Sequence, residues 1–457
     1  MTDPENNRNS SLMRDPPSLM RAFIRWRVDQ VIDPKKREKR RQKAEAKRLR
    51  SGEPHIVEYF HQLDDPYSHL AAQTLERLAE RYEIELKIHL IPATGGSAQP
   101  ELEKLEVWAR KDAELIAPHY GLSFDPKAPV LPDADVQRRA ADYLTGLAPA
   151  DRISELAKIG SAVWDGDAEV IPLAGGAQAR SGAALEAGAA RLKALRHYSG
   201  AMFYYGGEWY WGIDRLFYLE QRLRDLGVAK GEAARAGADF IAPRPAIDVS
   251  GIDASNLRLD FYPSINSPYT AIIYDKVIEV KDACGIEFHH KPVLPMVMRG
   301  VPAPVPKVEY IVFDTKRESE FLGVQFGPML TPLGNPTRRT YALFAWAAAQ
   351  GKDEALMSSL LKCAFANGVG IHTHKGMRQG IEAAGLDWTQ AKKRLDSDDW
   401  KPLIAKHQDE MIDGLGLWGV PSMRLSGPDG EPDVAVWGQD RLWLIAAEIR
   451  RRGQRTG

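Results

Sequence analysis

The sequence predicts an α/β protein in which one folding unit occurs twice, and two observations support this prediction. Residues 55–92 read as a strand, a turn, a helix that begins near Pro-Tyr, and a second strand that ends at a proline, and residues 257–292 repeat this order. Each copy then closes with the pattern Trp-Gly-x-Asp-Arg-Leu, at 211–216 and at 437–442. A unit that recurs in this way indicates two similar domains in tandem.

The repeat also predicts where the domains begin and end. We expect a first domain at residues 53–232, a linker at 233–256 and a second domain at 257–453. The linker is rich in Ala, Gly and Pro, which is typical of an exposed connection. The chain has 457 residues, which is enough for two or three domains with cores of their own.

The composition is that of a soluble globular protein and carries no overall charge signal. Apolar residues make up 44% of the chain, charged residues make up 27%, and the net charge is -1. Such a balance does not steer the whole protein toward nucleic acid or a membrane. The two cysteines, Cys284 and Cys363, are too far apart for a CxxC motif and allow no framework of disulfides, so we expect thiols in the cytoplasm.

Residues 1–52 predict a separate basic arm. Residues 1–17 are polar, and we expect them to be disordered. Apolar residues recur at helical spacing over 18–33, and residues 35–50 then hold ten Lys or Arg against two Glu, a local charge of +8. The arm lacks the apolar run of a signal peptide or a transmembrane helix. We favour a solvated, partly helical tail, and weak contact with a membrane surface or RNA is the alternative.

The first copy begins with two strands that flank a helix. The strands are predicted at 55–60 and 84–90, and the helix at 66–81. Helical periodicity returns at 102–120 and 133–162, which we interpret as a helical insertion. An insertion of this kind is a natural place for an apolar substrate pocket.

The second copy places a serine at the start of its helix. Leu259 and Phe261 alternate with polar neighbours as in a strand, and Ser267-Pro268 then opens a helix that ends at Gly285. The hydroxyl of Ser267 is therefore expected at a helix N-terminus, where free N–H groups and the helix dipole favour an anion. Taken alone, a serine in this position is also an ordinary helix cap.

The remainder of the second copy has a strand, a helical insertion and two pairs of histidines. The strand is expected at 286–291, and the insertion at 338–365 and 389–415. His289-His290 alternates across the strand, so at most one ring faces a site. His372 and His374 would share a face if they lay on a strand, as metal ligands sometimes do. Because no Cys or carboxylate stands at ligand spacing, we predict no metal site.

Four motifs of the second copy occur in an order that resembles a known family. The strand followed by Ser267-Pro268-Tyr269 resembles the opening of the 2-hydroxychromene-2-carboxylate isomerases and the kappa-class glutathione transferases. These are DsbA-like thioredoxin-fold proteins in which a serine replaces the redox cysteine. Residues 306–310, with Asp314 following, are similar to the family's lysine segment, 419–422 to its cis-proline loop, and 437–442 to its closing motif. The resemblance implies two tandem thioredoxin-like (DsbA-like) domains, each with an inserted helical subdomain.

The resemblance also implies glutathione as the cofactor and assigns residues that hold it. The backbone of the Val420-Pro421 loop would pair with the cysteinyl unit. Gln439 and Asp440 would take the γ-glutamyl end, and Lys307 would take a carboxylate of glutathione or of the substrate.

Ser267 is the catalytic residue that the resemblance implies. Its hydroxyl would donate a hydrogen bond to the glutathione sulfur and, with the helix dipole, lower the thiol pKa. The implied reaction is a glutathione-dependent cis–trans isomerisation or transfer on an unsaturated acid derived from an aromatic ring.

The first copy lacks the residues on which this chemistry depends. Asp65 stands where the second copy has Ser267, and Ala201 stands at the place of the cis-proline. Of the two closing-motif residues assigned to the γ-glutamyl end, only the aspartate is kept, as Asp214, because Ile213 stands in the place of Gln439. We interpret the first copy as a degenerate domain, which would cover in one chain the surface that single-domain relatives bury in a dimer, an intramolecular pseudo-dimer.

Two other function classes stay open. A thiol–disulfide oxidoreductase fits DsbA-like ancestry, but the chain has no paired cysteines that could cycle. A non-catalytic binding or scaffold protein on a thioredoxin fold is the stronger alternative. Glutathione titration separates this alternative from the isomerase.

Overall fold

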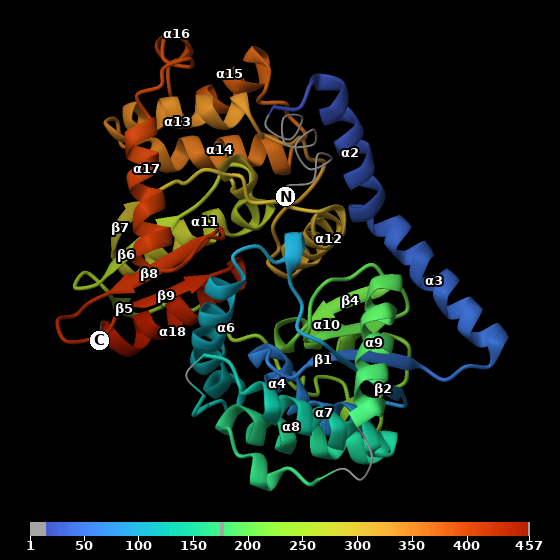
Figure 1. Ribbon diagram of the computed structural model, residues 1–457. Helices are drawn as coiled ribbons and strands as arrows, with labels where there is room; N and C mark the ends of the chain where they lie inside the picture. The colour runs from blue at the N-terminus through green and yellow to red at the C-terminus, as the bar shows by residue number, and fades with distance from the viewer. Residues whose placement is uncertain (1–14, 129, 174–177, 456–457) are drawn as a thin grey trace, which may run out of the picture. The chain divides into compact units, whose positions relative to one another are not determined.

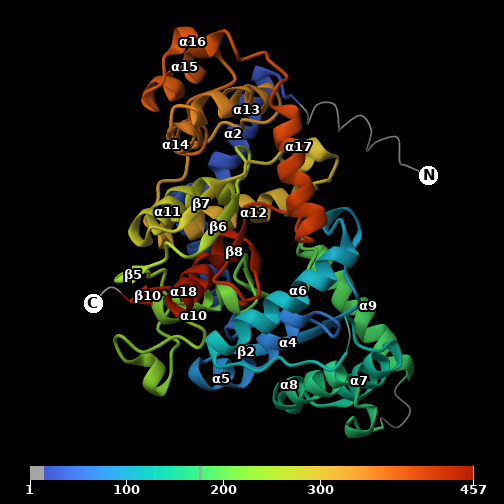
Figure 2. The same ribbon diagram turned by 90° about the vertical axis from the view of Figure 1, so that its left-hand side faces the viewer.

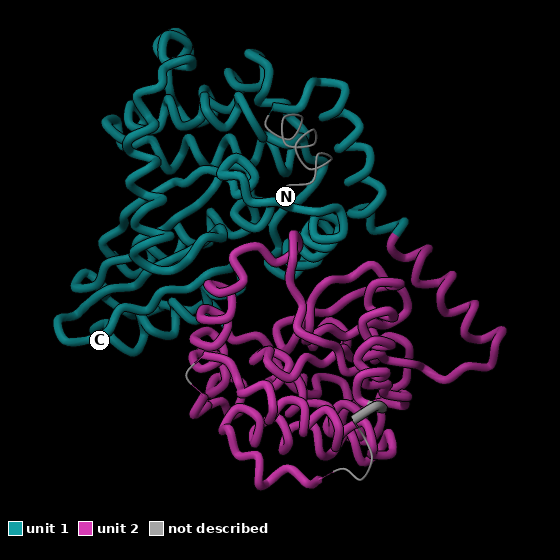
Figure 3. Tube along the Cα trace, in the orientation of Figure 1, with its two compact units in different colours: residues 1–36, 246–457 teal, residues 37–245 magenta. Residues whose placement is uncertain are grey.

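The computed structural model describes residues 15–128, 130–173 and 178–455 (Figure 1). It divides into two compact units (Figure 3). Unit 1 comprises the chain up to residue 36 and from residue 246 onward, and unit 2 comprises residues 37–245. Each unit contains a four-stranded sheet together with helices, so the α/β class predicted from the sequence is confirmed.

The sheet of unit 2 is made of β1 (Ile56–Gln62), β2 (Glu85–Ile91), β3 (Met202–Tyr205) and β4 (Glu208–Trp211). Its strand order is β2-β1-β3-β4. β1 pairs with β2 in parallel, and the pairs β1–β3 and β3–β4 are antiparallel. Val57, Tyr59 and Phe60 are fully buried, as expected of a central strand that is covered on both faces.

Helices surround this sheet, and one predicted helix is divided in two. The sequence predicts a single helix at 66–81, but Thr74 interrupts it, because its hydroxyl donates to the Ala71 carbonyl oxygen at 2.7 Å. The helices of unit 2 are α4 (Pro66–Ala72), α5 (Leu75–Arg81), α6 (Leu102–Ile116), α7 (Ala134–Gly146), α8 (Pro149–Asp165), α9 (Gln178–Ala194) and α10 (Leu216–Asp225).

The sheet of unit 1 is made of β6 (Arg258–Tyr262), β7 (Glu287–His290), β8 (Ser422–Ser426) and β9 (Val434–Trp437). Its order, β7-β6-β8-β9, and its pattern of parallel and antiparallel pairs are those of the sheet in unit 2. A separate two-stranded sheet joins β5 (Ile252–Asp253) to β10 (Gln454–Arg455).

The helices of unit 1 include a long pair that the sequence predicted as one stretch at 338–365. α13 and α14 lie side by side (Figures 1 and 2), and α14 also packs on α11. The helices are α2 (Ser18–Ile32), α11 (Pro268–Cys284), α12 (Val305–Phe321), α13 (Asn335–Ala348), α14 (Asp353–Phe365), α15 (His374–Ala383), α16 (Trp388–Lys392), α17 (Lys401–Asp409) and α18 (Leu442–Arg452).

The N-terminal segment differs from the solvated tail that the sequence predicted. α2 packs on α12, and Arg21 is only 2% exposed. The guanidinium donates to the Leu333 carbonyl at 2.7 Å and to the Thr331 carbonyl, and it pairs with Asp15 at 2.9 Å. The prediction is wrong for α2, because an arginine whose N–H groups meet backbone carbonyls can be buried. The disorder predicted for 1–17 falls mostly on residues 1–14, which lie outside the described residues.

The helix α3 (Pro34–Ser51) continues from α2 and has no buried residue. From Arg37 onward it belongs to unit 2, where Arg41 pairs with Glu208 at 2.7 Å. The segment 1–52 is therefore divided between the two units, and the boundary of the predicted basic arm does not coincide with a boundary of the structure.

The predicted linker at 233–256 is more closely packed than its composition suggested. Ile241 and Ala242 are buried in unit 2, and the Ile241 N–H donates to Glu220 at 2.7 Å. Val249 and Ile252 are buried in unit 1. The few apolar residues of the segment are thus part of the two cores, and the division between the units falls at 245/246.

Candidate functional site

Ser267 caps the helix α11, as the sequence predicted. Its Oγ accepts a hydrogen bond from the Thr270 N–H at 3.1 Å and donates to the Val420 carbonyl oxygen at 3.3 Å. The residue is 8% exposed. The hydroxyl therefore lies between the N-terminus of a helix and a loop that is distant in the sequence, and it can reorient its proton toward a third group.

The loop opposite Ser267 contains a cis peptide bond between Val420 and Pro421. The Gly438 N–H donates to the Pro421 carbonyl at 2.9 Å, which ties this loop to the closing motif. A side chain at Gly419 would run into the Trp437 ring, so the loop can approach the ring only because residue 419 is a glycine. Val420 is half-buried, and its N–H donates to no group in the described part of the chain.

A buried polar network on α12 connects α11 to the closing motif. Asp314 is fully buried, accepts from the Tyr269 hydroxyl at 2.9 Å, and pairs with Arg317 at 2.5 Å. One turn further along α12, Glu318 accepts from the side-chain amide of Gln439 at 2.5 Å. Charges can be buried here because each meets a hydrogen-bonding partner.

Gln439 and Asp440 have different surroundings, although the resemblance implies one role for both. Gln439 is 2% exposed, and the oxygen of its side-chain amide accepts no hydrogen bond from the described residues. Asp440 is half-buried and lies 3.9 Å from Arg441. The amide nitrogen of Gln439 is already used by Glu318 and its oxygen is buried, so any further hydrogen bond of this side chain is one that the oxygen accepts.

Lys307 lies on α12 two helical turns before Asp314, and therefore on the same face of that helix. It is half-buried, and this burial lowers the pKa of its ammonium group to about 8. The structure thus brings Ser267, Val420 and Pro421 together by direct contacts, and it connects Gln439 to α12, the helix that carries Lys307.

Tyr269, Arg317 and Glu318 belong to this site, although none of them was assigned a role from the sequence. The sequence signal for the tyrosine is the Pro-Tyr pair that begins the helix in both copies. The same contact occurs in unit 2, where the Tyr67 hydroxyl donates to the buried Asp112 at 2.7 Å. The two Tyr–Asp contacts have the same sequence separation of 45 residues. Arg317 and Glu318 have no such counterpart in the predicted repeat.

The corresponding place in unit 2 is closed by its own side chains. Asp65 caps α4, accepting from the Tyr67 and Ser68 N–H groups at 3.2 and 3.1 Å and from the Ser68 hydroxyl at 2.7 Å. The Ser68 Oγ in turn accepts from the Ala201 N–H at 2.9 Å. Burial raises the pKa of Asp65 to about 6. Ala201 has a positive φ of 56°, so this loop takes a conformation that proline cannot adopt.

The remaining histidines and cysteines form no second centre. His290 is held between Asp353 at 2.8 Å and the Tyr274 hydroxyl at 3.2 Å, while His289 is more exposed. His372 and His374 do not lie on a strand, since His372 is in a turn and His374 begins α15. Cys284 and Cys363 are both free and buried, and burial raises the pKa of each thiol. Within the described residues, no group of His, Cys, Asp and Glu is arranged to hold a metal ion.

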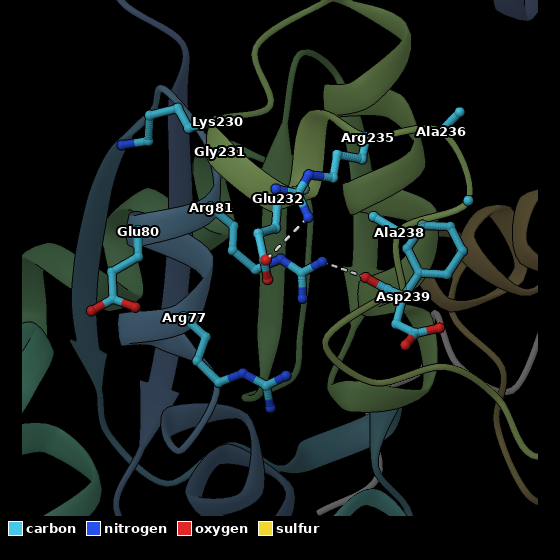
Figure 4. Close-up of a pocket in the computed structure, with 13 residues that line it drawn as sticks. Arg77, Glu80, Arg81, Lys230, Gly231, Glu232, Arg235, Ala236, Ala238 and Asp239 are labelled. Carbon is cyan, nitrogen blue, oxygen red and sulfur yellow. Dashed lines mark hydrogen bonds and ion pairs between the residues drawn. The ribbon is translucent and has the colours of Figure 1, made fainter.

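A surface cleft of about 740 Å³ lies elsewhere, in unit 2 (Figure 4). It is formed by α5 and the segment 230–240, and it contains none of the predicted site residues. Its charged groups are partly engaged with one another, since Arg235 pairs with Glu232 at 3.2 Å and Arg81 donates to the Asp239 carbonyl. The cleft has no group that connects it to the chemistry expected at Ser267.

Comparison with known proteins identifies the fold around Ser267. Residues 258–450 match the family described as DSBA-like thioredoxin domain. This range contains β6 to β9 and α11 to α17, and most of α18. Residues 258–450 therefore form a DsbA-like thioredoxin domain. No curated protein matches the chain.

Solved structures that are similar to part of this chain include an isomerase and two thiol oxidoreductases by name. A 2-hydroxychromene-2-carboxylate isomerase is 17% identical, with a TM-score of 0.36, over 42% of this chain and 95% of the other. A probable DsbA oxidoreductase from Streptomyces coelicolor is 16% identical, with a TM-score of 0.32, over 42% and 88%. The cytosolic disulfide reductase DsbM from Pseudomonas aeruginosa is 15% identical, with a TM-score of 0.34, over 42% and 98%. At these identities and scores the likenesses say nothing of activity.

Proposed function

We propose that the DsbA-like domain of unit 1 is a glutathione-dependent isomerase or transferase that acts on unsaturated acids derived from aromatic rings. The observation that carries this proposal is the position of Ser267. Its hydroxyl stands at the N-terminus of α11, within 3.3 Å of the carbonyl of Val420 that precedes the cis proline. A hydroxyl at a helix N-terminus can stabilise a thiolate by donating a hydrogen bond to it, and unlike a cysteine it cannot form a disulfide.

The groups around Ser267 fit the ends of a γ-glutamyl peptide. The half-buried Val420 N–H, which meets no partner within the described residues, is a donor for the backbone of the cysteinyl unit. The oxygens of Gln439 and Asp440 are acceptors that suit the α-ammonium group of the γ-glutamyl end. Lys307 offers a positive charge to a carboxylate.

The protein's own groups would orient the reactants, and the Ser267 hydroxyl would exchange its hydrogen bond to Val420 for one to the sulfur. When bound, glutathione would supply a thiol nucleophile for addition to an electron-poor double bond. The Ser267 proton, which points to the Val420 carbonyl, would turn to the sulfur and favour its charged form together with the dipole of α11. Lys307, with a pKa of about 8, keeps its proton at neutral pH and would hold the acid group of the substrate.

The proposal includes unit 2 as a second, degenerate DsbA-like domain. The support is the common strand order, the common pairing pattern, and the Tyr–Asp contact at the same separation. At the position of Ser267 this unit has Asp65, a carboxylate that would repel a thiolate and, when ionised, has no proton to donate. We therefore assign no glutathione site to it.

Calorimetric titration of the whole chain with glutathione, together with turnover of an aromatic cis-enoic acid, tests the proposal. We expect one equivalent per chain, and we expect Ser267→Ala to lower turnover about 100-fold while leaving the affinity for glutathione nearly unchanged. Two equivalents would show that Asp65 has been misinterpreted. Absence of binding would favour the non-catalytic alternative, and unchanged turnover in Ser267→Ala would make Ser267 a helix cap only.

A further inference from the structure

The helix α2 presents an apolar face to solvent although its opposite face is packed on the domain. Leu19 is 87% exposed, Phe23 54% and Trp26 56%. Their spacing of four and three residues places them on one side of the helix, and the rings of Phe23 and Trp26 are 5.9 Å apart. Exposed apolar side chains that gather in this way mark an interaction site more often than scattered ones do.

The other side of α2 anchors it firmly to unit 1. Val28 and Ile32 are buried, and Arg21 bonds to the backbone at Leu333. Arg27 also pairs with Glu309 of α12 at 2.8 Å. The exposed face is therefore held by a folded domain, so its residues do not need to be ordered at the moment of binding.

The chain next to this apolar face is strongly basic. Residues 18–51 contain 13 Lys or Arg and 4 Asp or Glu, so their net charge is 13 − 4 = +9, in a chain whose total is -1. Within α3, the exposed Lys39, Lys43 and Lys47 recur every four residues and form a stripe along the helix. α3 follows α2 after Asp33 alone, so the cations and the apolar residues are close to one another along the sequence.

We propose that residues 18–51 bind the surface of an anionic lipid bilayer. Leu19, Phe23 and Trp26 would enter the boundary between head groups and acyl chains, and the α3 cations would interact with the anionic head groups. None of the helices in the described ranges is both long and apolar enough to cross a bilayer, so the contact proposed is one with the membrane surface. This inference does not depend on the proposed chemistry at Ser267.

Two other occupants suit the segment less well. RNA phosphates would bind the cations and its bases could stack on the two rings, but RNA binding does not explain the exposed aliphatic side chain of Leu19. A second copy of the chain would bring two segments of charge +9 toward each other, which opposes association. An anionic bilayer matches both the charge and the apolar face.

Sedimentation of the full-length protein with vesicles tests this proposal. We expect binding to phosphatidylcholine vesicles that contain phosphatidylglycerol, weak binding to phosphatidylcholine alone, and a loss of binding as salt is raised. Replacing Leu19, Phe23 and Trp26 by Gln should weaken binding by at least about 30-fold. Replacing Lys39, Lys43 and Lys47 by Gln should weaken it about 100-fold, at roughly fivefold per cation near the surface.

A matched control uses apolar residues that are equally exposed elsewhere. Val170→Gln with Leu173→Gln removes side chains that are 50% and 82% exposed in unit 2, and it should leave vesicle binding unchanged. The proposal is overturned if the unmodified chain does not bind the anionic vesicles, or if the Leu19, Phe23 and Trp26 replacements have no effect. Binding of single-stranded RNA without vesicle binding, or self-association lost with the same replacements, would assign the surface to RNA or to a second copy.

Discussion

The starts of α4 and α11 occupy equivalent places in two sheets of the same order, yet their cap residues have different hydrogen-bond partners. In unit 2, Phe60 pairs with Met202, and the cap residue Asp65 follows five positions later. In unit 1, Tyr262 pairs with Ser422, and Ser267 follows at the same distance. The frame that holds the two caps is therefore the same, and the difference lies in the loop that faces them.

The loop difference follows from one backbone group. Proline has no N–H, whereas Ala201, at the place of Pro421, brings a buried donor that needs an acceptor. The Ser68 hydroxyl oxygen accepts from the Ala201 N–H at 2.9 Å, and the same hydroxyl donates a hydrogen bond to Asp65. Where the loop has alanine instead of proline, Ala201, Ser68 and the cap residue Asp65 are therefore joined by hydrogen bonds.

Substituting the unit 2 cap residue into unit 1 tests this comparison with the largest expected effect. Ser267→Asp keeps an acceptor for the Thr270 N–H but has no hydroxyl proton to donate, and it adds a charge of the same sign as a thiolate. We expect turnover to fall by at least about 100-fold, with thermal stability nearly unchanged. Ser267→Thr, which keeps both cap and donor, is the control. Activity retained by the Asp variant would show that the hydroxyl is not used.

The Tyr–Asp contacts test whether the two units share a structural frame. Tyr269→Phe and Tyr67→Phe each remove a donor from a buried carboxylate, so each should lower the free energy of unfolding by about 1–3 kcal/mol, measured by urea denaturation. Tyr143→Phe, whose hydroxyl lies 3.5 Å from Glu155, is the control and should cost less. A loss in only one unit would mean that the equal spacing has no common structural role.

The two units differ in charge at the position of Lys307. Lys307 precedes Asp314 by as many residues as Leu105 precedes Asp112, so unit 2 has an uncharged residue at the equivalent place. Burial lowers the pKa of Lys307 to about 8, so the ammonium group loses its proton as pH rises through that value. We expect the affinity for an acidic substrate, measured by calorimetry, to fall about tenfold from pH 7 to pH 9. Lys307→Arg should remove this pH dependence. An affinity that is constant over the range would place the substrate acid elsewhere.

Substitution of Asp65 should give the smallest effect, which is a change in the pH dependence of the free energy of unfolding. Burial raises its pKa from an ordinary 3.8 to about 6, so the folded chain holds a proton that the unfolded chain releases, and stability present near pH 4 is lost as pH rises through 6. Asp65→Asn cannot ionise, so its stability relative to the unmodified chain should rise by about 1–2 kcal/mol between pH 4 and pH 7.5. Urea denaturation at both pH values measures this change. Asp133→Asn, at the exposed cap of α7, is the matched control, and equal behaviour of the two variants would contradict the burial of Asp65.

Local signals in the sequence were sufficient for the starts of α4 and α11 and for the two strands that flank each of these helices. Ser267-Pro268 predicted a cap, and the Ser267 side chain accepts from a helix N–H group, as Asp65 does at the start of α4. The same signals did not predict the break at Thr74, because a single hydroxyl that bonds to the preceding turn leaves no trace in hydrophobic periodicity.

Burial of charge is what the sequence could not show. Arg21 interrupts the apolar residues of α2 and suggested a solvated helix, but carbonyl oxygens more than 300 residues away make it part of the interior. Asp314 and Glu318 stand in a charged stretch of α12, and they are buried because Tyr269 and Gln439 reach them from other elements. The pattern of a segment reports only its own residues, whereas a buried charge depends on partners that the fold brings to it.

By itself, the sequence determined where the first strand of each unit gives way to a helix, and that Ser267 stands at a helix N-terminus. These features depend on neighbours within a few positions, so they can be predicted from local patterns. Only the tertiary structure decided that Ser267 bonds to the Val420 carbonyl whereas Asp65 bonds to the Ser68 hydroxyl, and that α2 displays its apolar face while Arg21 is buried. Those outcomes depend on hydrogen-bond partners from distant parts of the chain, which no local pattern contains.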